Sequence, residues 1–171
     1  MKTIAILRGS LIGATLLIAA PLWAADASPK SQDFVMSASA ASIGEIETAK
    51  LALQKSQSTD VKTFAQHIID DHTKANTELK KLAQDNNLKI SDDPSMGDQA
   101  KAKVLNIRDE SFDAAYANNQ VNAHEEAVKL FKDAAENADD PEIKQFAQAT
   151  LPVLQQHLEM AQQLAKAHPS E

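Results

Sequence analysis

Four ionisable residues that lie far apart along the chain each occupy the centre of an apolar helical stripe. In the segment FAQHIIDDHTKANTELKKLA, residues 64–83, His72 lies among aliphatic residues that recur every three or four positions. Glu45, His124 and His157 repeat this pattern in three other segments. Imidazole nitrogens and carboxylate oxygens are ligands for Zn²⁺, Cu²⁺ and Fe²⁺. If the four side chains meet, the sequence predicts a core site for one transition-metal ion of undetermined identity.

The apolar neighbours of these residues define four stripes of helical period. They are Phe34, Ala38, Ala41, Ala49 and Ala52 around Glu45; Val61, Ala65, Ile68, Ile69, Ala75, Leu79, Leu82 and Ala83 around His72; Ala117, Val128, Phe131 and Ala135 around His124; and Ile143, Phe146, Val153, Ala161 and Leu164 around His157. Each stripe predicts a helix that directs one ionisable side chain toward the axis of a bundle.

Capping residues, prolines and turn-like stretches in the sequence indicate where the helices begin and end. We expect long helices at about 33–57, 58–87, 111–137 and 141–167, and a short helix at about 99–109. Ser31 or Asp33 is expected to cap the first helix, Ser111 the third, and Asp140 followed by Pro141 the fourth. No segment alternates with a period of two, so strands are not expected.

These elements predict an all-α fold, a ferritin-like four-helix bundle of two helical hairpins with a long middle connection that contains a short helix. The bundle domain would occupy residues 33–167. The middle connection is expected to cross the length of the bundle, although a local return and either direction of the third long helix remain open.

The four polar residues are expected to share one level of this bundle. Glu45 and His72 each lie about 13 residues, or about 20 Å of helix, from the turn between the first two helices. His124 lies about 15 residues before the last turn, and His157 about 17 after it. The difference of about two residues between His124 and His157 corresponds to about 3 Å along a helix, which is within the reach of side chains.

Residues one helical turn away supply further candidates. Gln120, Asn76 and Thr48 are positioned to orient the predicted ligands, and Met160 to offer a thioether to copper. Packing or local hydrogen bonding is the simpler interpretation of each. No role is assigned to His67 or His168.

Acidic pairs are interpreted as solvated surface or helix-end residues. They are Asp70 and Asp71, Asp92 and Asp93, and Glu125 and Glu126.

A polar core network is the alternative to a metal site. Buried His and Glu side chains can hydrogen-bond one another and fix helix register. The chain would then be a non-enzymatic interaction or structural protein. An enzyme is disfavoured, because no general base or nucleophile stands out beyond the candidate ligands.

The N-terminus predicts export. Residues 1–24 have Lys2 and Arg8 followed by an apolar run and small residues, which is typical of a secretory signal peptide, with cleavage possible up to residue 27. The expected location is the periplasm. There is no cysteine, so a lipoprotein anchor is excluded. No membrane span is expected after the signal is removed.

Charge restricts the partners. The formal net charge is −7, and without the predicted signal it becomes −9, which disfavours nucleic acid and anionic lipid. The sequence does not indicate a protein partner or an oligomeric state.

Three motifs support a family resemblance. FA…DH (residues 64–72), SFDAAYANNQVNAH (111–124) and FAQATLPVLQQHL (146–158), together with GEIE around Glu45, resemble a family of secreted bacterial proteins known as domain of unknown function 4142, placed in the ferritin-like superfamily. The resemblance covers about residues 33–165 and implies an exported ferritin-like bundle. It implies little chemistry.

Ferritin-type di-iron chemistry is disfavoured by a departure from its ligand pattern. Di-iron bundles use Glu-x-x-His pairs, whereas Ile69 and Leu154 stand three residues before His72 and His157. Glu45 is the one carboxylate expected at this level, so a mononuclear site fits better.

Overall fold

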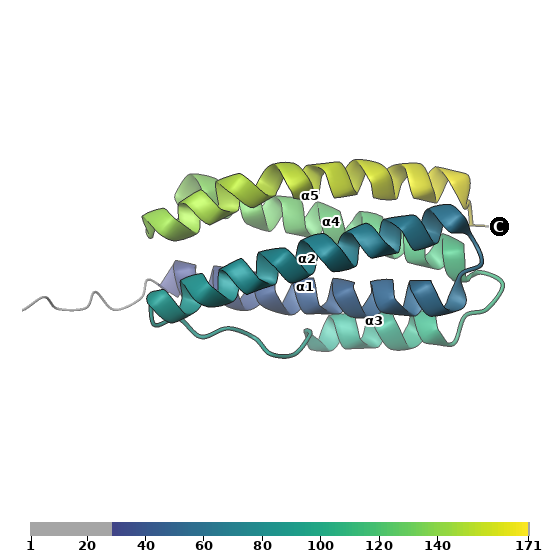
Figure 1. Cartoon of the computed structure of the whole chain (residues 1–171), viewed down its shortest axis with the longest axis horizontal. Coiled ribbons are helices and arrows are strands. Elements are labelled where there is room, and N and C mark those ends of the chain that lie inside the picture. Colours follow the sequence, from purple (N-terminus) through teal and green to yellow (C-terminus); the bar gives the residue numbers. More distant parts are fainter. Residues whose placement is uncertain (1–28, 171) are drawn as a thin grey trace, which may run out of the picture.

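The computed structural model describes residues 29–170, and within them all regular structure is helical (Figure 1). The elements are α1 (Pro29–Lys55), α2 (Thr59–Asp85), α3 (Met96–Asn106), α4 (Phe112–Asn137) and α5 (Pro141–Ala167). The all-α prediction is confirmed over this part of the chain. The predicted signal at residues 1–24 lies outside the described residues.

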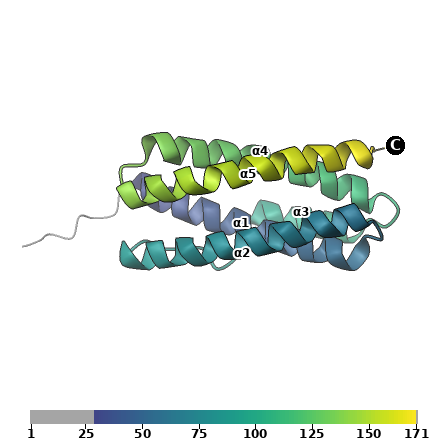
Figure 2. The same cartoon turned by 45° about the horizontal axis from the view of Figure 1, so that its top comes forward.

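The four long helices form a bundle in which each packs against two others. α1 packs against α2 and α4, and α5 packs against the same two helices. α1 and α2 form one antiparallel hairpin, and α4 and α5 form the other (Figures 1 and 2). The connection between the hairpins starts at one end of the bundle and, with α3, reaches the other, so α4 runs antiparallel to α1. α3 lies outside the bundle and packs against α1 and α4.

Of the cap residues predicted for the last two long helices, one forms capping hydrogen bonds and the other does not. Asp140 accepts hydrogen bonds from the backbone N–H groups of Glu142 (2.8 Å) and Ile143 (3.1 Å), with Pro141 in the first turn. Ser111 stands at the start of α4, but its side chain accepts no capping bond.

Two predicted helix starts are wrong. α1 extends back to Pro29, so Ser31 and Asp33 lie inside the helix; proline is favoured in a first turn, and this signal was missed. α3 begins at Met96 rather than 99, because the Ser95 hydroxyl accepts the Asp98 N–H at 3.1 Å.

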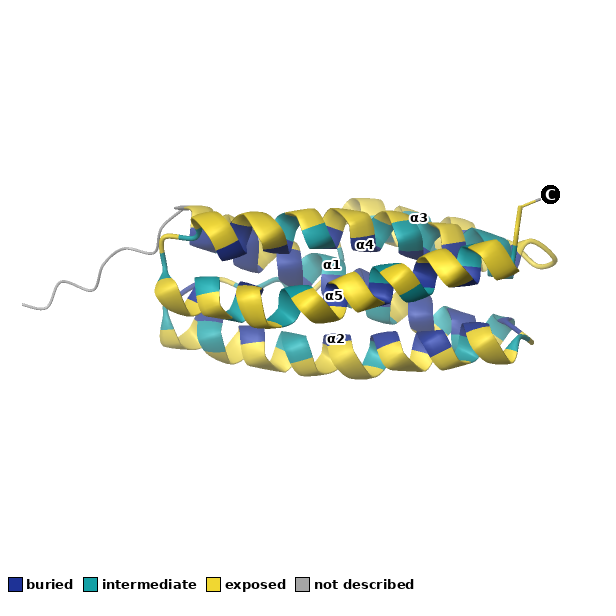
Figure 3. Cartoon of the chain, turned by 90° about the horizontal axis from the view of Figure 1, so that it is seen from above, coloured by how far each residue is buried: buried dark blue, intermediate teal, exposed yellow. Residues whose placement is uncertain are grey.

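Buried residues lie on the inner faces of the helices (Figure 3), and their side chains form two apolar clusters. One contains Phe34 and Phe131, whose ring centroids are 5.0 Å apart, and the other contains Phe64 and Tyr116, 6.2 Å apart. Each long helix contributes one half of its length to the first cluster and the other half to the second. The predicted polar residue of that helix lies between the two halves. The hydrophobic effect of both clusters therefore holds the polar level in place.

α3 approaches α1 closely at one glycine. A Cβ atom added to Gly44 would lie 2.7 Å from the Asp98 Cβ, which is below van der Waals contact. Gly44 therefore lets α3 lie directly over the segment of α1 that carries Glu45.

α5 continues through an internal proline. Pro152 has no N–H for the helical hydrogen bond to residue 148, and its ring crowds that turn of the helix. The next residue, Val153, was predicted to face the core but is 37% exposed. Its side chain lines a cavity between the helices instead of packing fully.

Within residues 29–170, no helix combines the length and apolar character needed to cross a membrane.

Candidate metal centre

The structure brings the three predicted histidines together in the middle of the bundle. One ring nitrogen each from His72, His124 and His157 lies within 4.8 Å of the other two. The ring centroids are 5.7 Å apart for His72 and His124, 5.6 Å for His72 and His157, and 5.3 Å for His124 and His157. All three residues are buried and come from α2, α4 and α5.

His124 is held in one tautomer by its own helix. Its Nδ1 lies 2.9 Å from the backbone carbonyl oxygen of Gln120, one turn earlier in α4. A carbonyl oxygen only accepts, so Nδ1 carries the proton and donates it. The neutral ring therefore presents the lone pair of Nε2 to the centre of the bundle.

His72 is oriented by α1. The Ser42 hydroxyl donates to the His72 carbonyl oxygen at 3.4 Å, which leaves the hydroxyl oxygen free to accept from the His72 Nδ1, 3.3 Å away. The lone pair is again on Nε2. Ser42 was missed in the sequence, although it lies three residues before Glu45 and so shares its helical face.

His157 uses the opposite nitrogen. Its Nε2 lies 2.9 Å from the Asp71 Oδ2, so this nitrogen donates to the carboxylate and Nδ1 carries the lone pair. The interpretation of Asp71 as solvated surface is therefore incomplete: its side chain is exposed as expected, yet it also fixes a buried ring. The position of Asp71 directly before His72 did not predict this hydrogen bond, because the bond joins α2 to α5.

The three lone-pair nitrogens accept no hydrogen bond from another histidine or from the backbone. His72 Nε2, His124 Nε2 and His157 Nδ1 are all buried, while the other nitrogen of each ring is hydrogen-bonded. A buried acceptor without a partner costs about 1–3 kcal/mol. The one proton of a neutral Glu45 could serve only one of them, so at least two such costs remain at one place, which is typical of a site built to receive a ligand.

Glu45 joins this cluster from α1. Its Oε2 lies 3.2 Å from the Nε2 of both His72 and His124, where an ionised carboxylate would offer neither lone pair a proton. Burial, and secondarily the charge of Asp98, raises the pKa of Glu45 from 4.5 to about 8. In the protein without a cation, Glu45 is therefore neutral at pH 7, and its single carboxyl proton can pair with only one of these two nitrogens.

Burial also lowers the pKa of each histidine. The pKa of His124 falls to about 4, and those of His72 and His157 fall below 6.5, with the neighbouring imidazoles adding to the effect at His72. All three rings are neutral at pH 7. Neutral imidazole is the protonation state that binds metal ions.

These residues fit a single metal ion. Tetrahedral coordination with Zn–N bonds of about 2.0–2.1 Å needs ligand atoms about 3.4 Å apart. The nitrogens lie within 4.8 Å of one another, so the rings need only draw together slightly. Each ring already donates its other N–H to an oxygen, which is the usual support of a metal-ligating histidine.

The residues predicted to support the ligands lie near the centre but have different contacts. The Gln120 side chain donates to the Thr48 hydroxyl at 3.3 Å, and Thr48 donates to the Glu45 carbonyl oxygen at 3.1 Å. Asn76 lines a cavity beside the histidines, and Met160 packs partly buried against the second apolar cluster.

The remaining histidines are outside the centre. His67 is exposed, and His168 lies 3.1 Å from the Asp60 carboxylate near the end of α5.

Two cavities adjoin the centre on different sides. The first has a volume of about 240 Å³ and reaches His72, His157 and Glu45 between α1, α2, α4 and α5. The second, of about 400 Å³, lies between α1, α3 and α4 and also reaches Glu45. The buried centre therefore borders space that side chains leave unfilled on two sides.

Solved structures of other proteins share this fold. A DUF305 fragment from Deinococcus radiodurans matches with a TM-score of 0.72 and 14% identity, over 82% of this chain and 98% of that one. CopM in its Cu(I)-bound form matches with a TM-score of 0.69 and 20% identity, over 80% and 96%. Its Cu(II)-bound form matches with a TM-score of 0.65 and 19% identity, again over 80% and 96%.

Comparison of sequences gives the family but no characterised relative. No curated protein matches this sequence. The family model described as a domain of unknown function, DUF4142, matches residues 19–164, and the chain belongs to this family.

Proposed function

We propose that the protein binds one transition-metal ion at the centre of its bundle, through His72, His124, His157 and Glu45. The observation that carries this proposal is the set of three buried lone-pair nitrogens whose opposite nitrogens are all hydrogen-bonded and which share at most one proton donor, Glu45. A bound cation would occupy the lone pairs and would also favour ionised Glu45, offsetting the cost of burying that charge.

We further propose a divalent ion, with Cu²⁺ bound most tightly among the first-row metals. Imidazole and carboxylate ligands suit Zn²⁺, Cu²⁺ and Fe²⁺, and affinity for such sites rises toward Cu²⁺. The similarity to the fold of copper-bound CopM supports testing copper first. The Glu-x-x-His pairs of di-iron bundles are absent, since Ile69 and Leu154 stand in their place.

Metal buffering or protection against metal stress in the bacterial envelope is the role that we propose for this site. Export from the cytoplasm, a periplasmic location and membership of the ferritin-like superfamily belong to the same proposal. They rest on the sequence of residues 1–24 and on the motifs around His72, His124 and His157.

A polar core network is the competing interpretation, favoured by the 3.2 Å approach of the Glu45 carboxyl group to two histidines. In such a network the close groups would pair by hydrogen bonds. Here the one proton of Glu45 can pair with His72 or His124, and at least two of the three lone-pair nitrogens are left without a donor. Metal binding accounts for this arrangement better.

The metal content of protein purified without chelator tests the proposal. We expect about one equivalent of a single transition metal and its loss in His124→Ala, because the remaining ligands cannot enclose the ion. His67→Ala is the matched control, since His67 is exposed. Folded protein that stays metal-free after dialysis against Zn²⁺, Cu²⁺ and Fe²⁺ would favour the polar network.

A further inference from the structure

The first cavity is a compartment with an apolar wall and a polar floor. Its wall includes Leu79, Phe131 and Phe146, and its floor is formed by His72, His157 and Glu45, which are 6%, 3% and 5% exposed. The volume of about 240 Å³ exceeds what one water molecule occupies. A cavity with this division of chemistry is suited to a molecule with one polar end and an apolar body.

The sequence explains why space remains here. Small residues, Ala75 on α2 and Ala149 on α5, line the cavity where larger side chains would close the seam. Pro152 interrupts the hydrogen bonding of α5 along the same wall, and Val153 stays partly exposed beside it. An apolar side chain that lines a cavity leaves surface that a ligand can bury.

The polar atoms of the floor determine the polar end of the ligand. His72 Nε2, His157 Nδ1 and Glu45 Oε2 belong to residues that line this cavity, and these three atoms hold at most one proton between them. His124 does not line it. A divalent ion held by three neutral imidazoles and one carboxylate would keep one positive charge, which favours a monoanionic group as a fifth ligand when the coordination expands from four to five.

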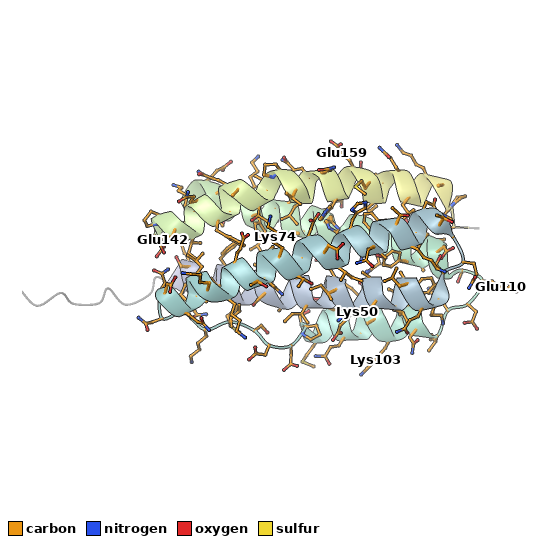
Figure 4. All side chains as sticks on the ribbon, viewed as in Figure 1. Lys50, Lys74, Lys103, Glu110, Glu142 and Glu159 are labelled. Atoms are coloured by element: carbon orange, nitrogen blue, oxygen red, sulfur yellow. The ribbon has the colours of Figure 1, made fainter. Side chains whose placement is uncertain are left out.

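We propose that this cavity is a binding site for small carboxylates, whose anionic group meets the metal ion and whose apolar chain lies between α2 and α5. The inference rests on the proposed metal site. Lys74 of α2 (labelled in Figure 4) lines the cavity together with Asp71 and Glu78, so the entrance itself does not attract an anion and the bound metal ion would supply the attraction.

Chain length is the variable that separates cavity binding from simple anion binding. Each methylene buried in an apolar cavity raises affinity about fourfold. The protein would be loaded with Co²⁺, which reports a new ligand through its visible absorption, and titrated with acetate, propionate and butyrate. We expect affinity to rise about fourfold per added methylene.

Two alanine substitutions provide the matched comparison. Ala149→Leu enlarges an exposed residue that lines the first cavity, so it is expected to fold normally and to abolish the dependence on chain length. Ala123→Leu makes the same change in the second cavity and should preserve this dependence. Both variants should keep the metal stoichiometry of the native protein.

The outcomes distinguish the two proposals. Equal affinity for all three carboxylates, or no absorption change in protein that has bound one Co²⁺, would overturn the cavity proposal alone. Equal butyrate binding by the metal-free protein, followed through a change in unfolding temperature, would also overturn it. Failure to bind Co²⁺ or any other transition metal would overturn both proposals.

Discussion

At the scale of single residues, the site depends on which ring nitrogen of each histidine carries the proton. A histidine whose proton faces the centre cannot ligate there, so the oxygen beyond each ring decides whether the lone pair is available. The three oxygens are of different kinds: the Ser42 hydroxyl, the Gln120 backbone carbonyl and the Asp71 carboxylate. Only the carboxylate and the hydroxyl can be changed by mutation without moving the backbone.

Asp71→Asn should weaken metal binding without changing the fold. The amide can turn its NH₂ group toward His157 Nε2, which favours a proton on Nδ1 and blocks the lone pair. We expect affinity to fall about 10- to 100-fold, measured by competition with a chromophoric chelator.

Asp70→Asn is the control for this substitution. Asp70 is the preceding residue and accepts a hydrogen bond from Gln66 on its own helix. Its replacement should leave metal affinity unchanged. Equal losses in the two variants would mean that Asp71 acts only through general surface charge.

At the scale of helices, the close approach of α3 to α1 depends on one missing side chain. Gly44→Ala places a Cβ atom 2.7 Å from the Asp98 Cβ, so α3 must move outward. We expect a loss of about 1–3 kcal/mol in the free energy of unfolding, measured with urea. Backbone amides of α3 should also exchange faster with solvent.

Gly97→Ala is the matched control within α3 itself. The nearest atom to its added Cβ is the Ser95 Oγ at 3.6 Å, which is ordinary contact. Alanine is a better helix residue than glycine, so stability should be unchanged or higher by up to about 1 kcal/mol. A destabilisation equal to that of Gly44→Ala would show that the α1–α3 contact is not the cause.

The helices and the residues at their centres were predictable because both follow from periodicity. An apolar stripe gives the inner face of a helix, and a polar residue within it is identifiable before any contact is known. The contact of Asp71 with His157 and the exposure of Val153 were not predicted, for a different reason. Their environments depend on the α2–α5 seam, where Pro152 and small alanines leave space, and periodicity along one helix contains no information about a neighbouring helix.

At the scale of the whole molecule, the buried centre predicts the pH dependence of stability in the metal-free protein. Below pH 6.5 the unfolded chain protonates its histidines, whereas His72, His124 and His157 stay neutral in the folded protein, so stability rises with pH. Glu45 acts in the opposite direction, because between about pH 4.5 and 8 the folded protein keeps a proton that the unfolded chain releases.

We therefore expect the free energy of unfolding to be greatest near pH 6.5. Three histidines outweigh Glu45 below that value, and Glu45 alone lowers stability above it, by at most about 1.4 kcal/mol per pH unit. Urea unfolding of metal-free protein between pH 5 and 9 measures the curve. Glu45→Gln should remove the decline between pH 6.5 and 8, and a native protein that shows no decline would contradict the burial of Glu45.

Each long helix contributes one polar residue to the centre, and this determines when during folding the proposed metal site can form. Glu45, His72, His124 and His157 are separated by at least 27 residues along the chain, so the unfolded polypeptide holds no two of them together. A nascent chain lacking α5 would present an incomplete set. If the proposed site binds an ion, the complete ligand set forms only after both hairpins have docked in the correct register, and bound metal would then mark those molecules.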